Sequence, residues 1–146
     1  MVKDSFAVDP RILAESVVLA EGGLCHVRLM DDARFPWLLL LPRRAGLVEL
    51  TDLGVTDRAL LMEEIGVAAA ALKAAMPFEK LNVAALGNSV RQLHVHVLGR
   101  SSGDAAWPGP VWGSGARQPR TPLEGAALIE RLHEALRAAG WQGRAD

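Results

Sequence analysis

Residues 92–98 (QLHVHVL) constrain the fold more strongly than any other part of the chain. In a β-strand, successive side chains point to opposite faces, so this segment has an aliphatic face and a polar face. The aliphatic face consists of Leu93, Val95 and Val97. The polar face consists of Gln92, His94, His96 and Leu98. Because the first face needs a core and burying the second without partners is costly, we expect a sheet with a hydrophobic core on one side and a polar cavity or a ligand on the other.

Other segments also have the composition of strands. Apolar and β-branched runs predict strands at 16–20, 24–30, 37–41 and 80–85, and the histidine strand extends over 93–100. The sequence EGG that follows the first strand is typical of a hairpin turn. In the second strand, Cys25, Val27 and Leu29 share one face. Strands joined mostly by hairpins predict an antiparallel sheet of about five strands.

Two main helices accompany these strands. Thr56 is predicted as the N-cap of a helix that runs to about Met76. Its apolar side chains recur at helical spacing, at Leu61, Ile65, Ala68, Leu72 and Met76. Residues 121–124 (TPLE) combine an N-cap, a proline and a capping-box glutamate, which predicts a second helix that ends near Gly140. Strands and helices together predict an α+β fold.

The two ends of the chain have less regular patterns. Residues 1–15 are expected to be a loosely structured lead-in, with a short helical turn after Pro10. Residues 101–120 are rich in Gly, Pro and Ser but contain Trp107 and Trp112, whose exposure to water would be costly, so we expect an ordered loop. We expect a single domain over residues 1–146, with its core at about 15–100 and a C-terminal loop and helix at 101–140.

Composition excludes several classes of protein. The 146 residues include 16 Lys and Arg and 17 Asp and Glu, for a formal net charge of −1. This balance gives no broad electrostatic reason to bind nucleic acid or a membrane surface. The N-terminal residues lack the apolar stretch of a signal peptide, and no segment is suited to span a membrane. Cys25 is the only cysteine, so an internal disulfide is excluded and a reducing, cytoplasmic location is expected.

The spacing of His94 and His96 leaves three interpretations open. The two imidazoles are either half-exposed surface groups, ligands of a metal ion, or part of an anion-binding or catalytic site. Zinc requires three or four protein ligands, and the remaining candidates, Cys25 and His26, lie on opposite faces of their strand, so at most one of them can join. Residues 87–89 (GNS) favour the third interpretation, since such a turn offers a hydroxyl, an amide and backbone N–H groups to an anion.

This part of the chain resembles the histidine triad (HIT) superfamily of nucleotide hydrolases and nucleotidyl transferases. The family motif is His-φ-His-φ-His-φ-φ, where φ is hydrophobic, and a Gly-Gln-Ser-φ turn commonly precedes it. The matching stretches are 87–90 (GNSV) and 92–98 (QLHVHVL). Residues 37–44 (WLLLLPRR) are similar to the family's hydrophobic strand with a following proline and basic pair. The resemblance covers about residues 15–100 and implies a HIT-like fold.

Two positions depart from the family pattern. Gln92 stands where the family usually has its first histidine, which resembles a bacterial branch with Gln at that position. The strand that begins at Trp37 and the Pro-Arg-Arg segment after it lack the further histidine that family members often carry there. The middle histidine, which carries the covalent chemistry in the family, is kept as His94.

The resemblance implies nucleophilic catalysis on phosphorus. One nitrogen of His94 is expected to donate to a backbone carbonyl, so that the other keeps its lone pair and attacks the α-phosphate of a nucleoside phosphate derivative. A nucleotidyl-histidine then forms and passes its nucleotidyl group to water or another acceptor. His96 and Gln92 are the other predicted catalytic residues, and Ser89 is expected to bind phosphoryl oxygens. A neutral Gln92 can donate a hydrogen bond but cannot supply a proton, so we expect an altered leaving-group preference or weak activity.

The resemblance also implies residues for the rest of the substrate and a partner. Asp31 is the predicted ribose-binding residue, and Asn88 and Asn82 are predicted near the phosphates. No cofactor or metal is expected. The family is typically homodimeric, and residues 67–72 (VAAAAL) fit either a dimer interface or the core. Trp107 and Trp112 either cover the nucleotide or pack on the sheet.

Three functional hypotheses follow. The first is a nucleotide hydrolase or transferase that acts through His94. The second is a nucleotide-binding module of the same fold with little or no turnover, which the absent first histidine favours. The third is a metal-bound interaction domain.

Overall fold

The computed structural model describes residues 5–146 and contains one antiparallel sheet of five strands. The strands are β1 (Ser16–Glu21), β2 (Cys25–Met30), β3 (Trp37–Pro42), β4 (Lys80–Ala84) and β5 (Val95–Arg100). Their order across the sheet is β1-β2-β3-β5-β4. The helices are α1 (Pro10–Glu15), α2 (Val55–Ala75) and α3 (Pro122–Ala138), with a 3-10 turn at Leu50–Asp52. The predicted α+β fold with two main helices is confirmed.

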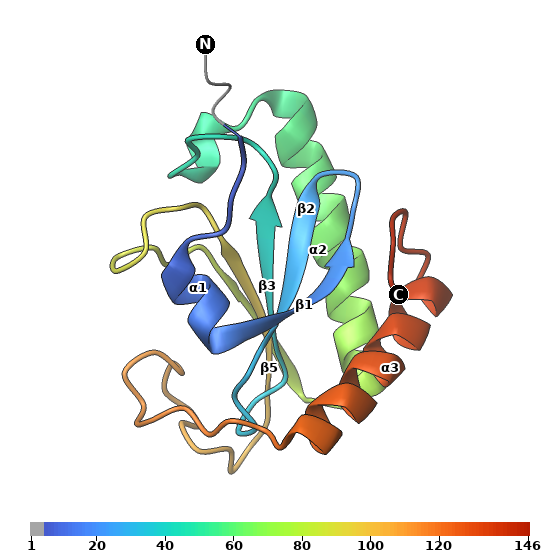
Figure 1. Ribbon diagram of the computed structural model, residues 1–146. Coiled ribbons are helices and arrows are strands. Elements are labelled where there is room, and N and C mark those ends of the chain that lie inside the picture. Colours follow the sequence, from blue (N-terminus) through green and yellow to red (C-terminus); the bar gives the residue numbers. More distant parts are fainter. Residues whose placement is uncertain (1–4) are drawn as a thin grey trace.

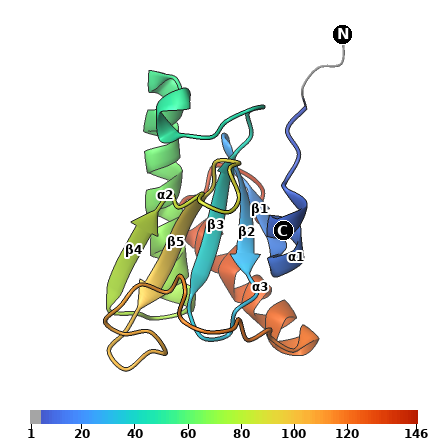
Figure 2. The same ribbon diagram turned by 90° about the vertical axis from the view of Figure 1, so that its left-hand side faces the viewer.

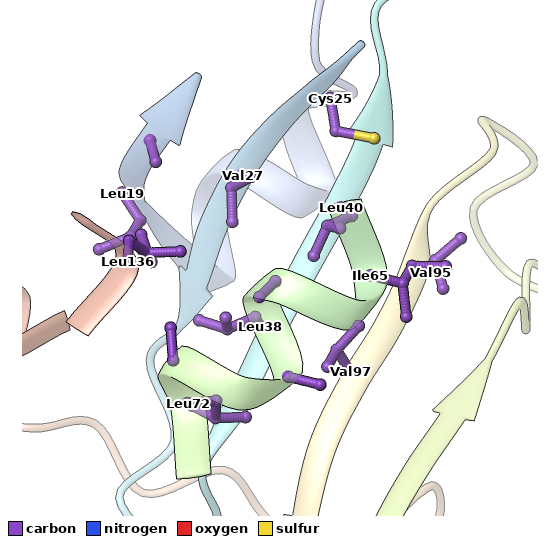
Figure 3. Packing of buried hydrophobic residues seen from close by; sticks show 14 of the residues in the cluster. Leu19, Cys25, Val27, Leu38, Leu40, Ile65, Leu72, Val95, Val97 and Leu136 are labelled. Carbon is purple, nitrogen blue, oxygen red and sulfur yellow. The ribbon is translucent and has the colours of Figure 1, made fainter. Parts of the chain in front are cut away.

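Helices α2 and α3 cover one face of the sheet (Figure 1). The aliphatic face of the histidine strand points toward them, because Leu93, Val95 and Val97 all belong to this core. Figure 3 shows the same alternation in the neighbouring strands, with Leu38 and Leu40 directed at α2. The run 67–72 also lies in α2 and contributes Ala68, Ala69, Ala71 and Leu72 to the core, so packing within the chain accounts for most of it.

The start of α2 differs from the prediction. Gly54, in an extended conformation, is the N-cap, and Thr56 is the second helical residue. Glycine is acceptable at an N-cap, and the helix gains Asp57 in its first turn, where a carboxylate interacts favourably with the helix dipole. The prediction for α3 is confirmed: the Thr121 hydroxyl accepts from the Glu124 N–H, and the Glu124 carboxylate accepts from the Thr121 N–H.

The histidine strand begins two residues later than its alternation suggests. The Leu93 N–H donates to the carbonyl of Leu47, at 3.0 Å, rather than to a neighbouring strand. Regular pairing with β3 and β4 begins only at Val95 and His96. Gln92 and His94 therefore belong to the connection that leads into β5, where the chain is free to present them to a cavity.

A buried carboxylate that the sequence patterns did not reveal holds the first hairpin. Glu64, in the middle of α2, accepts hydrogen bonds from the backbone N–H groups of Leu24 and Cys25, at 2.8 and 2.9 Å. A Cβ atom on Gly22 would lie 2.3 Å from a Glu64 carboxylate oxygen, so this turn residue has to be glycine. Glu64 thus fixes the β1–β2 hairpin against the helix.

On the opposite face of the sheet, α1 lies at the β1 edge and the loop 101–120 runs across one end (Figure 2). A second hydrophobic cluster lies there and consists of Ile12, Met30, Phe35, Trp37, Leu39, Leu41, Leu98 and Val111. Two buried ion pairs, Arg34 with Asp32 and Arg100 with Asp104, each at 2.8 Å, flank this cluster and hold the loop. The predicted ordered loop is therefore confirmed. Within residues 5–146, no helix has the length and apolar character needed to cross a membrane.

Candidate active site

A polar cavity of about 340 Å³ lies beside the turn that leads into β5. It is lined by Val48, Glu49, Ala85, Gly87, Asn88, Arg91, Gln92, Leu93 and His94. The turn itself requires glycine at its first position, because a Cβ atom on Gly87 would lie 2.8 Å from the carbonyl oxygen of Val90. The sequence thus folds a tight turn that brings a backbone amide segment and an imidazole to one cavity.

One ring nitrogen of His94 is hydrogen-bonded to the backbone, and the other keeps a free lone pair. Its Nδ1 lies 2.7 Å from the carbonyl oxygen of Gln92. A carbonyl can only accept, so Nδ1 carries the hydrogen and Nε2 of the neutral ring keeps its lone pair. The side chain is buried but lines the cavity. A fixed tautomer with a lone pair at a cavity is the arrangement that a nucleophilic imidazole needs.

His96 has the opposite tautomer. The indole Nε1 of Trp37 donates to His96 Nδ1 at 3.0 Å, so the hydrogen of the neutral ring is on Nε2. Burial, and to a smaller extent the nearby His94, lower the pKa of His96 to about 4, while the backbone of Leu86 opposes the shift. The two histidine rings lie 4.9 Å apart between centroids. His96 is therefore a neutral hydrogen-bond donor at physiological pH.

Trp112 from the C-terminal loop packs on this imidazole. Its ring centroid lies 5.1 Å from that of His96 and 6.5 Å from that of Trp37, edge to face in both cases. Among residues 5–146, the buried side-chain nitrogens or oxygens without a hydrogen-bond partner are His96 Nε2 and Trp112 Nε1. Both lie in this cluster, which fits a polar site better than a structural core. Sequence reasoning placed Trp112 in an ordered loop but gave no role to Trp37, although Trp37 begins the strand beside the motif.

A comparison with family models matches residues 13–103 to the HIT domain. The chain belongs to the HIT family. The match includes Trp37 and both histidines of the motif and ends before Trp112. No curated protein matches the chain.

Solved structures of HIT proteins have the same architecture. A histidine triad protein from Sinorhizobium meliloti is 45% identical, with a TM-score of 0.87 over 89% of this chain and 96% of its own. One from Bradyrhizobium japonicum is 40% identical, with a TM-score of 0.87 over 90% and 98% of the two chains. One from Marinobacter aquaeolei is 37% identical, with a TM-score of 0.88 over 93% and 99%.

Gln92 makes hydrogen bonds through both its backbone carbonyl and its side-chain amide. The carbonyl of Gln92 orients His94, as described above. Its side-chain amide accepts from the N–H of Asp9, at 2.8 Å, and donates to the carbonyl of Ala7, at 2.7 Å. The side chain of Gln92 is thus bound to the N-terminal segment.

The predicted phosphate-binding residues differ in their positions. Asn88 lines the cavity, whereas Ser89 is exposed beside it, and its carbonyl accepts from Arg11 at 2.8 Å. Asn82 is half-buried on β4 opposite Leu98, on the sheet face that also carries His96, but it does not line the cavity.

Asp31 is not brought to the histidines. It follows the last residue of β2, whereas β5 begins beside the first residues of β2, in the row that contains Val27, Leu40 and Val95. Its carboxylate accepts from the Arg120 N–H at 2.9 Å and lies 3.5 Å from the Arg117 guanidinium. The sequence alone identifies Asp31 as an acid in a loop, and only the fold shows which groups surround it.

The alternation predicted for β2 places Cys25 in the helix-covered core, where burial raises the pKa of its thiol. His26, on the opposite face, lies 2.5 Å from Glu21 and 3.2 Å from Arg28. Neither residue joins His94 and His96. No group of three or more His, Cys, Asp or Glu side chains suited to hold a metal ion occurs in the described part of the chain.

Proposed function

We propose that this HIT protein is a nucleotide hydrolase or nucleotidyl transferase in which His94 attacks the α-phosphate of a nucleoside phosphate derivative. The observation that carries the proposal is the hydrogen bond from His94 Nδ1 to the Gln92 carbonyl. It leaves the Nε2 lone pair on a side chain that lines a cavity within the usual range of ligand sites. Membership of the HIT family supports this chemistry over a metal site or a surface role.

The reaction has two displacement steps. In the first, a bond forms between Nε2 and phosphorus as the bond from phosphorus to the leaving group breaks with its electron pair, and the leaving group takes up a proton from solvent water. In the second, water or another acceptor attacks the same phosphorus, releases Nε2 and loses a proton. Nδ1 remains hydrogen-bonded to Gln92 in both steps, which stabilises the positive charge that develops on the ring.

The neighbouring donors stabilise the charge on the phosphoryl oxygens. His96 supplies a neutral N–H from Nε2, and the Asn88 amide and the Ser89 hydroxyl lie at or beside the cavity. Asn82 is the least favourably placed of these donors, since it lies on β4 opposite Leu98, away from the cavity. Gln92 contributes through its backbone carbonyl, which accepts from His94 Nδ1. The proposed site does not include Asp31, because its carboxylate is bound to Arg120 and Arg117.

A nucleotide-binding module with little turnover is the second candidate. It is favoured by the low pKa of His96 and by the Gln92 amide, since neither group supplies a proton to a leaving group near neutral pH. Such a protein would bind nucleoside monophosphates in the same cavity.

One experiment separates the two candidates. Turnover of adenosine phosphoramidate, adenosine phosphate esters and dinucleoside polyphosphates is measured for the wild type, His94→Ala and the control His133→Gln, which removes a histidine of α3 that bonds to Leu19. We expect His94→Ala to lose a factor of about 10³ or more in kcat/KM, and His133→Gln to turn over normally. Binding of adenosine monophosphate without turnover in any of the three proteins would favour the module.

We also propose that two copies associate through strand β4. β4 is the last strand of the sheet and has a free edge among the described residues. Val83 on this strand is 45% exposed, and Met62 on the adjoining helix is 65% exposed. An apolar cavity of about 250 Å³ lies between the two elements. Light scattering tests this proposal: the wild type is expected at twice the monomer mass and Val83→Asp at the monomer mass, and a monomeric wild type at micromolar concentration would contradict it.

A further inference from the structure

The N-terminal segment of residues 5–9 is tied to the candidate site by one side chain. Gln92 accepts from the Asp9 N–H and donates to the Ala7 carbonyl, at 2.8 and 2.7 Å. These two backbone groups are two residues apart on a segment without helix or strand. A side-chain amide carries its donor and acceptor on one planar fork and so matches such a pair, whereas the two nitrogens of an imidazole point away from each other. Gln92 therefore makes a pair of hydrogen bonds that a histidine at this motif position could not make.

A second contact joins the same two parts of the chain. Arg11 donates to the carbonyl of Ser89 at 2.8 Å and is itself held by the carboxylate of Asp9. The Arg11 side chain and its backbone N–H keep the pKa of Asp9 below its ordinary value. The segment is thus attached directly at Gln92, and the start of α1 that follows it is attached at Ser89, within the turn that carries the phosphate-binding candidates.

The attached segment completes a second cavity of about 320 Å³. Its lining includes Ala7 and Asp9 from the segment and Arg44, Val48 and Gln92 from the body of the protein. Val48 and Gln92 also line the cavity of His94, so the two cavities are neighbours that meet at these residues. Without residues 7–9, the second cavity would lack a wall.

We propose that Gln92 is a positioning residue that latches residues 5–9 over the site, so that the second cavity holds one of the two groups attached to the reacting phosphate. The inference rests on the proposed function, in which His94 attacks that phosphate. The side chain of Gln92 does not touch the phosphate in this arrangement. Its loss weakens binding of substrate and transition state alike, which raises KM and leaves kcat largely unchanged.

The test compares Gln92→Met, which has a similar size and no polar atoms, with the wild type. The control is Gln142→Met, because the Gln142 side chain donates only to the nearby Gly140 carbonyl. In Gln92→Met we expect amide hydrogen exchange at Asp9 to be about tenfold faster, and KM to rise by about tenfold, since two hydrogen bonds of ordinary strength are lost. The kcat value should change by less than about threefold, and Gln142→Met should behave as the wild type.

A double-substitution cycle separates the latch from a direct contact. Asp9→Pro removes the N–H that Gln92 binds, and the backbone angle φ of −53° at Asp9 suits proline. Asp9→Ala, which loses the carboxylate but keeps the N–H, is its reference. If Gln92 acts through the segment, Gln92→Met combined with Asp9→Pro has the same KM as Asp9→Pro alone. If the Gln92 side chain contacts the phosphate, the effects multiply and kcat falls, and the proposal is wrong.

The exchange measurement keeps this proposal separate from the catalytic one. Hydrogen exchange at Asp9 is measured without substrate. Unchanged exchange in Gln92→Met overturns the latch whatever the kinetics. Faster exchange in Gln92→Met, together with a wild type that turns over none of the substrates, would retain the latch as a structural contact and overturn both the catalytic function and the role of the latch in substrate binding.

Discussion

The two faces of the sheet use the same strands but are built for different tasks. The face under α2 and α3 is packed almost entirely with Leu, Val, Ile and Ala side chains. The face under α1 and the C-terminal loop buries His96, Arg28 and Arg100 among its apolar groups. It also holds both unpartnered buried nitrogens found in residues 5–146, on His96 and Trp112. On the first face the buried polar side chains Glu64 and His133 are hydrogen-bonded to backbone groups. The second face buries more polar side chains and leaves two of their nitrogens without a partner, which is the arrangement expected of a binding site rather than of a core.

Adjacent leucines on β3 give the sharpest test of this difference. Leu38 is fully buried in the helix-covered core, so Leu38→Ala is expected to lower the free energy of unfolding by about 2–5 kcal/mol. The substituted side chain is on the far face from His94, so kcat of the folded protein should be unchanged. Urea unfolding and activity at a temperature well below the transition measure the two effects.

Leu39 is the matched residue for comparison with Leu38. It is 1% exposed, but its side chain lies on the other face of the sheet, where it is the cross-strand neighbour of His96. Leu39→Ala should lose less stability than Leu38→Ala, because a loop relaxes into a cavity more readily than packed helices do. The Leu39→Ala variant should also have a lower kcat, since it has a void beside His96, the proposed donor to the phosphoryl oxygens. Equal losses of stability and equal activities in the two variants would contradict the division of the sheet into a structural and a functional face.

The buried imidazole on the loop-covered face makes stability depend on pH. The pKa of His96 is lowered from 6.5 to about 4 by folding. Between these values the unfolded chain binds a proton that the folded protein does not, so this group's stabilisation is present above pH 6.5 and is lost as pH falls toward 4. The full effect corresponds to about 3 kcal/mol. Urea unfolding at several pH values should show that His96→Gln loses less stability than the wild type over this window, and parallel curves would refute the prediction.

A carboxylate on the helix-covered face makes a smaller contribution. Glu64→Gln replaces one of the two acceptor oxygens by an amide nitrogen, so one of the N–H groups of Leu24 and Cys25 loses its partner. We expect a loss of about 1–3 kcal/mol. Its exposed neighbour provides the control, since Glu63→Gln should change the free energy of unfolding by less than about 0.5 kcal/mol. Thermal unfolding of both variants gives the comparison.

Substitutions at the helix caps are expected to give the smallest loss of stability. Thr121→Ala removes the hydroxyl that caps α3 and should cost about 1 kcal/mol. Thr56→Ala should cost clearly less, because Gly54 and not Thr56 is the cap of α2. The reverse order in chemical denaturation would show that the boundary of α2 is misplaced.

Local patterns in the sequence predict most of the fold. Alternation identifies the face of β5 that enters the core, and the TPLE motif gives the start of α3. The same patterns misplace the start of α2 and extend β5 by two residues. In the second case a contact between Leu93 and Leu47, which are 46 residues apart, competes with strand pairing. Local propensity carries no information about such a contact.

The candidate site is less accessible to sequence reasoning. The family motif points to His94 and His96, but their tautomers depend on one neighbouring carbonyl and on Trp37, which is 59 residues from His96. The sequence also gives Gln92 a position in the motif without showing that residues 7–9 bind its amide. Asp31 is an acid in a loop until the fold places two arginines around it. Apart from the local bond of His94 to the Gln92 carbonyl, the missing information in each case is a contact between residues that are distant in the sequence.

Capture of the covalent intermediate shows directly whether His94 is the nucleophile. The protein is mixed with adenosine phosphoramidate, quenched within milliseconds to seconds, and examined by peptide mass spectrometry and phosphorus NMR. We expect an adenylyl group bonded to Nε2 of His94, which appears at the rate of the first step and is absent from His94→Ala. Turnover that proceeds without this adduct, or that persists in His94→Ala, would contradict this role of His94.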